Sequence, residues 1–268
     1  MNRYGTENLI FLARYSMLYK SISGVSLALL FGFALNTAQA DDFSLGLTAG
    51  WSSKLYKGVN PNKNDLIFPN IDYDAGRFWF HGLSAGYDLL QTPADNISIV
   101  GYYFPLAFKA SDSHSSAMRQ LKNRRSTLMT GIRYEHESLS MGKFETTLAT
   151  DALGTSNGFH WNNAWSYPVQ LGSLGIEPSV GFNWNDRKFN KYYYGISASE
   201  ATRSGLRKYT PDQSVTPYAE INMNYMITQN WNIYGGARYT LLPNDVRKSP
   251  MVEKDSLLSF WTGFSYMF

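Results

Sequence analysis

The sequence contains no cysteine among its 268 residues. It can therefore form no disulfide, and it offers no site for the lipid that anchors a bacterial lipoprotein. Charged residues are also scarce, at 17% of the chain, and they nearly balance, with a formal net charge of +3. Because a nucleic-acid-binding protein usually carries a marked basic excess, this balance argues against nucleic acid as a partner.

Long hydrophobic runs are missing from the body of the chain, where no stretch approaches the roughly 18 apolar residues of a membrane-spanning helix. This excludes a helical membrane protein. Aromatic residues, by contrast, make up 16% of the chain, with 19 tyrosines and 7 tryptophans, and there are 22 glycines. Such a mixture is typical of a β-rich protein.

The first 40 residues have the pattern of a cleaved signal peptide. Basic residues precede an apolar run over 22–35, which is too short to span a bilayer, and the small-residue sequence Ala38-Gln39-Ala40 follows it. We expect cleavage after Ala40, which leaves residues 41–268 as one mature domain. An uncleaved N-terminal anchor is the alternative. Export without an anchor leads to the periplasm, the medium or the outer membrane.

The C-terminal segment SLLSFWTGFSYMF alternates apolar and small or polar residues. One face includes Phe264, Tyr266 and Phe268, and the chain ends on this aromatic face. This pattern resembles the insertion signal that the barrel-assembly machinery receives from bacterial outer-membrane barrels. The segments 215–227 and 231–241 have the same period of two, which requires lipid or a core on one side and water on the other.

Less regular segments of the same kind bring the number of expected strands to eleven, joined by alternating short turns and long loops. A single-chain bacterial barrel with both ends in the periplasm needs an even number. We therefore expect one further reversal within RFWFHGLSAGYDLL, at Gly82 or a neighbour. The sequence predicts an all-β protein, a monomeric transmembrane antiparallel barrel of about 12 strands, with ten or fourteen as alternatives.

The predicted location is the outer membrane of a Gram-negative cell, with lipid around the barrel. A soluble β-sandwich or a periplasmic barrel is the alternative, but neither needs aromatic residues at the ends of strands, where they suit the membrane interfaces. The residues of this kind are Trp51, Trp161, Trp165, Trp184, Trp231 and Tyr266.

The segment NKYYYGISASEATRSGLRKY, at 190–209, interrupts this alternation in the longest loop, on the expected extracellular side. Its three tyrosines come just after a strand, where their rings suit the rim of the barrel. Ser197 and Glu200 have capping-box spacing, and Gly205 supplies a stop, so we predict a short helix over about 198–204. A helix of two turns is unstable alone in water, so we expect it to pack over or into the barrel mouth, with a mobile loop as the alternative.

This segment resembles the signature of the MipA/OmpV family of outer-membrane proteins, and of its YiaT-like branch in particular. The motif residues are Tyr192, Tyr193, Tyr194, Gly195, Ser197, Glu200, Ser204, Gly205, Leu206 and Tyr209. The resemblance implies an outer-membrane β-barrel. It also implies a link to murein (peptidoglycan) synthesis, because the family's namesake is described as a scaffold for a lytic transglycosylase and a bifunctional penicillin-binding protein.

Residues for catalysis are not grouped in the sequence. The histidines His81, His114, His136 and His160 are scattered over different segments, without a serine or aspartate signature beside them. No metal-ligand spacing and no glycine-rich phosphate loop is present. We therefore expect no enzymatic activity, no cofactor and no metal.

The alternation also assigns charged side chains to the lumen of the barrel. The four basic and five acidic residues are Arg125, Arg133, Arg187 and Arg238, and Glu135, Glu145, Asp151, Glu177 and Glu220. We expect opposite charges to pair across a narrow lumen, which makes the barrel more plugged than open. The predicted role is a structural or scaffolding one. A narrow passive diffusion channel for small polar solutes and a surface interaction or adhesion protein are the alternatives.

Overall fold

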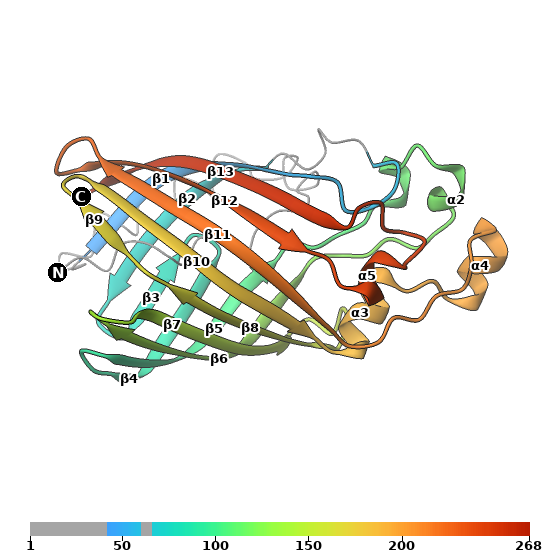
Figure 1. Cartoon of the computed structure of the whole chain (residues 1–268), viewed down its shortest axis with the longest axis horizontal. Coiled ribbons are helices and arrows are strands. Elements are labelled where there is room, and N and C mark those ends of the chain that lie inside the picture. Colours follow the sequence, from blue (N-terminus) through green and yellow to red (C-terminus); the bar gives the residue numbers. More distant parts are fainter. Residues whose placement is uncertain (1–41, 60–65) are drawn as a thin grey trace, which may run out of the picture.

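A computed structural model describes residues 42–59 and 66–268 as an antiparallel β-barrel with short helices gathered at one end (Figure 1). The predicted signal peptide and its cleavage site lie outside these residues. No helix in the described part of the chain is long and apolar enough to cross a bilayer.

The wall consists of thirteen strand segments that form twelve barrel strands. The segments are β1 (Asp42–Ser52), β2 (Leu66–Ala75), β3 (Phe78–His81), β4 (Ser84–Gln91), β5 (Asp95–Phe104), β6 (Thr127–Ser138), β7 (Gly142–Asp151), β8 (Phe159–Ser166), β9 (Val169–Leu171), β10 (Leu174–Asn185), β11 (Ser214–Met226), β12 (Trp231–Leu241) and β13 (Ser256–Met267). β8 and β9 both pair with β10 and are one strand, interrupted where Pro168 has no N–H to donate. β1 pairs with β13 and closes the barrel, so the predicted fold class is confirmed.

The additional reversal lies where the sequence predicted it. Gly82 has φ 57° and joins β3 to β4, and its N–H donates to the carbonyl of Ile71 on β2 at 2.9 Å. β3 has only four residues, so its period of two is too short to be read as a strand of its own. The split at Gly82 makes the strand number even and places both ends of the barrel on the same side.

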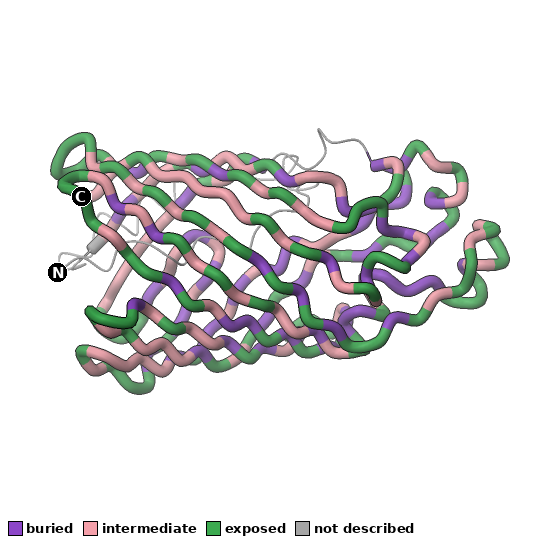
Figure 2. Tube along the Cα trace, viewed as in Figure 1, coloured by how far each residue is buried: buried purple, intermediate pink, exposed green. Residues whose placement is uncertain are grey.

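Alternation along the strands separates a lipid-facing surface from a polar interior. Leu47, Ile132 and Phe260 point outward and are about half exposed, whereas Thr48 and Ser98 point inward and are buried. Figure 2 shows this alternation of exposed and buried residues along the wall. A soluble protein would bury its apolar face, so the exposed apolar belt indicates acyl chains as its surroundings.

The two ends of the barrel differ in their connections. Short turns join β2 to β3, β4 to β5, β6 to β7, β9 to β10 and, through 227–230, β11 to β12. These five turns lie at the end where β1 begins and β13 ends. The opposite end carries the long loops with η3 (Ala110–Asp112), α2 (Ser116–Arg119), α3 (Arg187–Tyr194), α4 (Ala198–Ser204) and α5 (Asn244–Arg247). By the usual construction of outer-membrane barrels, the short turns are periplasmic and the long loops extracellular.

Candidate functional site

The predicted helix in the longest loop is present as α4, with the predicted bounds. Ser197 is the N-cap, and its hydroxyl accepts from the Glu200 N–H while the Glu200 carboxylate accepts from the Ser197 N–H at 3.0 Å. Gly205 ends the helix with φ 69°. The hydroxyl of Ser204 donates to the carbonyl of Glu200 at 2.7 Å. The capping box is therefore formed as the sequence predicts.

The three tyrosines lie on a second helix, α3, which the sequence reasoning missed. We expected Tyr192, Tyr193 and Tyr194 at the rim just after a strand, but α3 begins after the N-cap Asp186, whose carboxylate accepts from the N–H of Phe189 at 2.8 Å. An Asp followed by aromatic residues four positions apart is a signal that could have revealed this helix.

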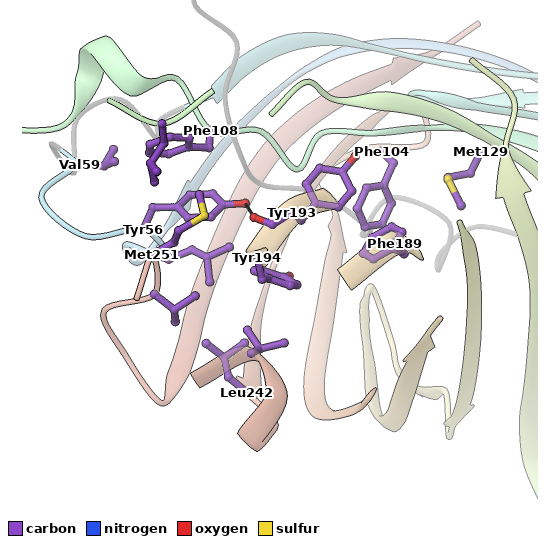
Figure 3. Close-up of a cluster of buried hydrophobic side chains, with 14 of the residues drawn as sticks. Tyr56, Val59, Phe104, Phe108, Met129, Phe189, Tyr193, Tyr194, Leu242 and Met251 are labelled. Atoms are coloured by element: carbon purple, nitrogen blue, oxygen red, sulfur yellow. Dashed lines mark hydrogen bonds between the residues drawn. The ribbon is translucent and has the colours of Figure 1, made fainter. Parts of the chain in front are cut away.

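α3 places aromatic side chains in the core of a loop cluster at the barrel mouth (Figure 3). Phe189 and Tyr193 are almost fully buried, and the Phe104 ring of β5 meets the Phe189 ring edge-on at 5.4 Å. The Tyr56 hydroxyl of the first loop donates to the carbonyl of Tyr193 at 3.4 Å. We call this cluster, with the loops that carry it, the loop cap. Its buried residues are Leu55, Tyr56, Val59, Phe104, Phe108, Ala110, Met118, Leu121, Phe189, Tyr193, Tyr194, Ile196, Leu242, Val246, Met251 and Val252. The same apolar cluster continues into the barrel with Trp79, Val100, Tyr102, Met129 and Ala149.

A buried ion pair ties two loops of the cap together. Arg124, just before β6, donates to Glu200 at 2.9 Å, and the two side chains are only 7% and 4% exposed. Arg124 also donates to the carbonyl of Gly195 at 3.0 Å, and the Lys122 N–H donates to Glu200 at 3.0 Å. Glu200 thus caps its own helix and binds the preceding loop at the same time, which explains how so short a helix is held.

The pKa of Glu200 reflects these contacts. Burial alone would raise the pKa of this carboxyl, but the N–H groups of Ser197 and Lys122, the Arg124 guanidinium and the Ser197 hydroxyl together lower it to about 2. The carboxylate is therefore ionised throughout the ordinary pH range, and the ion pair is a permanent part of the cap.

The remaining motif residues hold the end of the loop. Tyr209 pairs with Ile196 through two backbone hydrogen bonds, and its hydroxyl donates to the Asp245 carbonyl at 2.9 Å, which connects this loop to the last one. Leu206 is partly buried against the cap. In Figure 1, α3 lies at the mouth and α4 farther out, so α4 packs on the cap rather than into the barrel. Its contacts are with α2.

Most of the expected lumen charges do point inward, but two do not. Arg187 is the first residue of α3 and is exposed, and Arg125 precedes β6 and is exposed as well. Their assignment to the lumen is wrong because both positions lie outside the strands: β10 ends before Arg187, and β6 begins after Arg125. Asp151 ends β7 at the cap side, where its carboxylate accepts from Thr127 at 2.5 Å and from the Leu153 N–H at 3.0 Å.

Two ion pairs of the lumen join adjacent strands of the wall. Arg238 pairs with Glu220 on the adjacent strand, directly opposite in register, and Lys143 pairs with Glu135 at 2.5 Å, again between neighbours. Adjacent strands lie about 4.8 Å apart, whereas the far wall of a twelve-stranded barrel is out of reach for these side chains. The expectation of pairing across a narrow lumen is therefore wrong for these two pairs.

Other inward groups were not identified from the sequence. Asp88 of β4 accepts from the Trp79 indole at 3.0 Å and from Ser98 at 2.8 Å, and Asp72 of β2 accepts from Ser44 at 2.9 Å. Both residues lie in segments where apolar and polar residues alternate least regularly. The sequence therefore did not show that their side chains point into the lumen. In the described part of the chain, no group of three or more His, Asp or Glu side chains could hold a metal ion.

The expected insertion signal lies on the outer face of β13. Phe264 is 45% exposed, and the Tyr266 ring meets the rings of Trp231 and Phe268 edge-on at 5.1 and 4.9 Å. Phe268 also packs against Phe43 of β1 at 5.3 Å. These rings form part of the aromatic belt at the periplasmic interface and cover the junction of the first and last strands.

Comparison with known proteins now decides the family. The profile described as "MltA-interacting protein MipA" matches residues 45–268. The chain belongs to the MipA family. It is 41% identical over 245 residues to the MltA-interacting protein of Escherichia coli, which covers 91% of this chain and 98% of that protein. It is 32% identical over 232 residues to the outer-membrane protein YiaT of Escherichia coli, which covers 87% of this chain and 93% of that protein.

The family expectation is thus confirmed, and the protein is an outer-membrane β-barrel of the MipA family. The expected closer likeness to the YiaT branch is wrong, because the identity to the MltA-interacting protein is higher. Among solved structures, the NanC porin is similar with a TM-score of 0.47 and 9% identity, over 83% of this chain and 98% of that one. We draw no conclusion from a likeness of this size.

Proposed function

We propose that this MipA-family barrel is a non-enzymatic structural or scaffolding component of the outer membrane, linked to murein synthesis. The observation that carries the proposal is the similarity to a relative named MltA-interacting protein, which extends over 98% of that protein. A lytic transglycosylase is therefore the first partner to test, and a penicillin-binding protein the second.

The docking area on the periplasmic side is small, because the turns there are short. A standard interface buries about 800 Å² on each partner. The turn between β6 and β7 offers an apolar contact, since Leu139 is 93% exposed and Met141 is 62% exposed. The proposed partner would cover this turn.

Affinity purification from crosslinked envelopes tests the proposal. We expect a lytic transglycosylase to co-purify with the wild-type barrel, and we expect Leu139→Glu to reduce its yield severalfold. Leu153→Glu is the matched control, because Leu153 is also exposed, at 62%, but lies in the loop between β7 and β8 at the opposite end. Absence of the enzyme from the wild-type eluate, or equal loss in both variants, would contradict a periplasmic scaffold.

A narrow diffusion channel is the second candidate, favoured by the polar lining of the barrel. The loop cap at the extracellular mouth argues against it, because an apolar cluster there leaves ions without a hydrated path. Planar-bilayer recordings distinguish the two functions. Steady single-channel steps from the purified protein would favour the channel, whereas a silent bilayer, together with co-purification, favours the scaffold.

A further inference from the structure

The lysines and arginines of the barrel are concentrated at its extracellular end. In the described part of the chain, Arg77, Arg133, Lys143 and Arg238 are the only ones outside the long loops and their helices. The basic residues of these loops outnumber the acidic ones by more than two to one. The surface that projects from the membrane is therefore positively charged and attracts anions, although the whole chain is nearly neutral.

Three of these cations share one face of α3. Arg187, Lys188 and Lys191 are all exposed, and their spacing places them on the side of the helix opposite Phe189 and Tyr193. Phe189 and Tyr193 are almost fully buried in the loop cap. Because the cap holds the aromatic face of the helix, the basic face is held outward.

Arg125 adds a fourth cation at the C-terminal end of α3. Its N–H donates to the Tyr192 hydroxyl at 2.8 Å, and its carbonyl accepts from the Tyr193 hydroxyl at 3.2 Å. The Arg125 side chain is exposed. These hydrogen bonds bring cations from two loops to one place at the barrel mouth. We call Arg125, Arg187, Lys188 and Lys191 the basic rim.

The charges of the basic rim are not neutralised by the protein itself. Among residues 42–59 and 66–268, none of its four side chains forms an ion pair. Two carboxylates belong to the adjoining segments, and both accept from the backbone. Asp186 accepts from the Phe189 N–H at 2.8 Å, and Asp212 accepts from the Gln213 N–H at 2.9 Å. Since like charges close together on a helix repel one another, a bound anion would stabilise this face.

The outer wall directly below the basic rim is aromatic. Trp184, three residues before Arg187, pairs in register with Trp161 of β8, which is 40% exposed. Phe159 at the start of β8 is 46% exposed, and its carbonyl accepts from the Asp186 N–H at 3.1 Å. α3 therefore begins at the extracellular ends of β8 and β10, just above rings that face lipid (Figure 1).

We propose that the basic rim binds the phosphate groups of lipopolysaccharide in the outer leaflet. The lipid A part of this glycolipid carries phosphates on a disaccharide, from which acyl chains extend into the bilayer. A molecule beside β8 and β10 has its acyl chains against the aromatic wall and its phosphates at the height of α3. Guanidinium and ammonium groups there form charge-assisted hydrogen bonds to phosphate oxygens. The site lies at the end of the barrel opposite the proposed partner surface, so it does not depend on the scaffold function.

Native mass spectrometry of the detergent-purified protein, freed of co-purifying lipid, tests the site with diphosphoryl lipid A as the probe. We expect a saturable adduct whose apparent Kd rises about threefold in Lys188→Gln, since one exposed charge contact is lost. The combined change Arg187→Gln, Lys188→Gln and Lys191→Gln should raise it by about tenfold or more. Lys188→Arg keeps the charge and should bind like the wild type.

Arg77→Gln is the matched control, because it removes an exposed cation from the periplasmic turn between β2 and β3. Its apparent Kd should equal that of the wild type. Heat-modifiable migration in gels confirms that each variant is folded. An unchanged Kd in the folded triple variant, or a rise in Arg77→Gln as large as in Lys188→Gln, overturns the proposal.

The chemical group that is recognised is tested with two further lipids and with salt. Dephosphorylated lipid A and phosphatidylglycerol should bind about tenfold more weakly than diphosphoryl lipid A. Equal binding of the dephosphorylated form would show that phosphate is not recognised, and equal binding of phosphatidylglycerol would show a site for any anionic lipid. Added salt should weaken binding to the wild type more than to the triple variant, because it screens exposed charges. Equal salt dependence in the two proteins also overturns the site.

Discussion

Glu200 is the residue on which the loop cap depends most directly. Its carboxylate accepts from two backbone N–H groups, one in its own helix and one in the preceding loop, and from Arg124. The Arg124 guanidinium has carboxylate and carbonyl oxygens as partners, and it is 7% exposed. Removal of the Glu200 charge would leave this guanidinium buried without its counter-ion.

We expect Glu200→Gln to destabilise the cap by about 3–5 kcal/mol, the usual cost when one member of a buried ion pair is lost. Amide hydrogen exchange over α4 and the segment 122–124 measures the effect. Lys208→Gln, an exposed change in the same loop, is the control and should leave exchange unaltered. Equal protection of α4 in Glu200→Gln and wild type would show that the ion pair does not hold the cap.

The lowered pKa of Glu200 sets the pH range in which the cap is stable. Because the folded-state pKa, about 2, lies below the ordinary value of 4.5, the stabilisation is fully present above pH 4.5 and is lost as the pH falls toward 2. After correction for intrinsic rates, exchange protection of α4 should be constant at neutral pH and decrease only in this acidic window. In Glu200→Gln, the acidic decrease should be absent. A loss of protection near pH 6 would contradict this assignment.

At the scale of single elements, α4 depends on a left-handed residue at its end. Gly205 has φ 69°, and no other atom lies near the position that a Cβ would occupy there. A larger residue is therefore opposed only by backbone strain. We expect Gly205→Ala to destabilise α4 by about 1–2 kcal/mol. Gly205→Asn should cost less, because asparagine tolerates this conformation better. Amide exchange of 198–204 measures both, and equal effects of the two changes would argue against backbone strain as the cause.

The two neighbouring helices show what a sequence can and cannot reveal about the loop cap. α4 could be predicted to its bounds because its signals, Ser197, Glu200 and Gly205, all lie within the helix and its caps. α3 also has local signals, in its N-cap Asp186 and its aromatic residues four positions apart, but its place at the barrel mouth depends on the contact of Phe189 with Phe104 of β5, far away in the sequence. The partner of Glu200 could not be predicted either, since Arg124 lies 76 residues away.

At the scale of the whole molecule, the strand number could be predicted because two independent rules agree. The alternation of apolar and polar residues gave eleven strand segments. Because a barrel needs an even number of strands, one further turn was required, and it lies at Gly82. The pairing of lumen charges could not be predicted, because it depends on register. Only the register shows that Glu220 lies directly opposite Arg238 on the next strand.

Closure of the barrel depends on close contact between β1 and β13. A Cβ at Gly46 would collide with the backbone carbonyl of Phe264 on β13, whereas a Cβ at Gly101 has room. We therefore expect Gly46→Val to lose most of its folded, heat-modifiable form in gels, while Gly101→Val keeps it. Normal closure in Gly46→Val would mean that the wall adjusts to the added side chain at little cost.

The pairing of β1 with β13 also determines the order of events during biogenesis. These strands are the farthest apart in the sequence, so their contact has the highest contact order in the protein and the largest loop-closure entropy. Until β13 arrives, every intermediate is an open sheet with two unprotected edges, which are prone to aggregate. Pairing of the first strand with the last is therefore the expected rate-limiting step of folding. Before this step the nascent barrel most needs a chaperone.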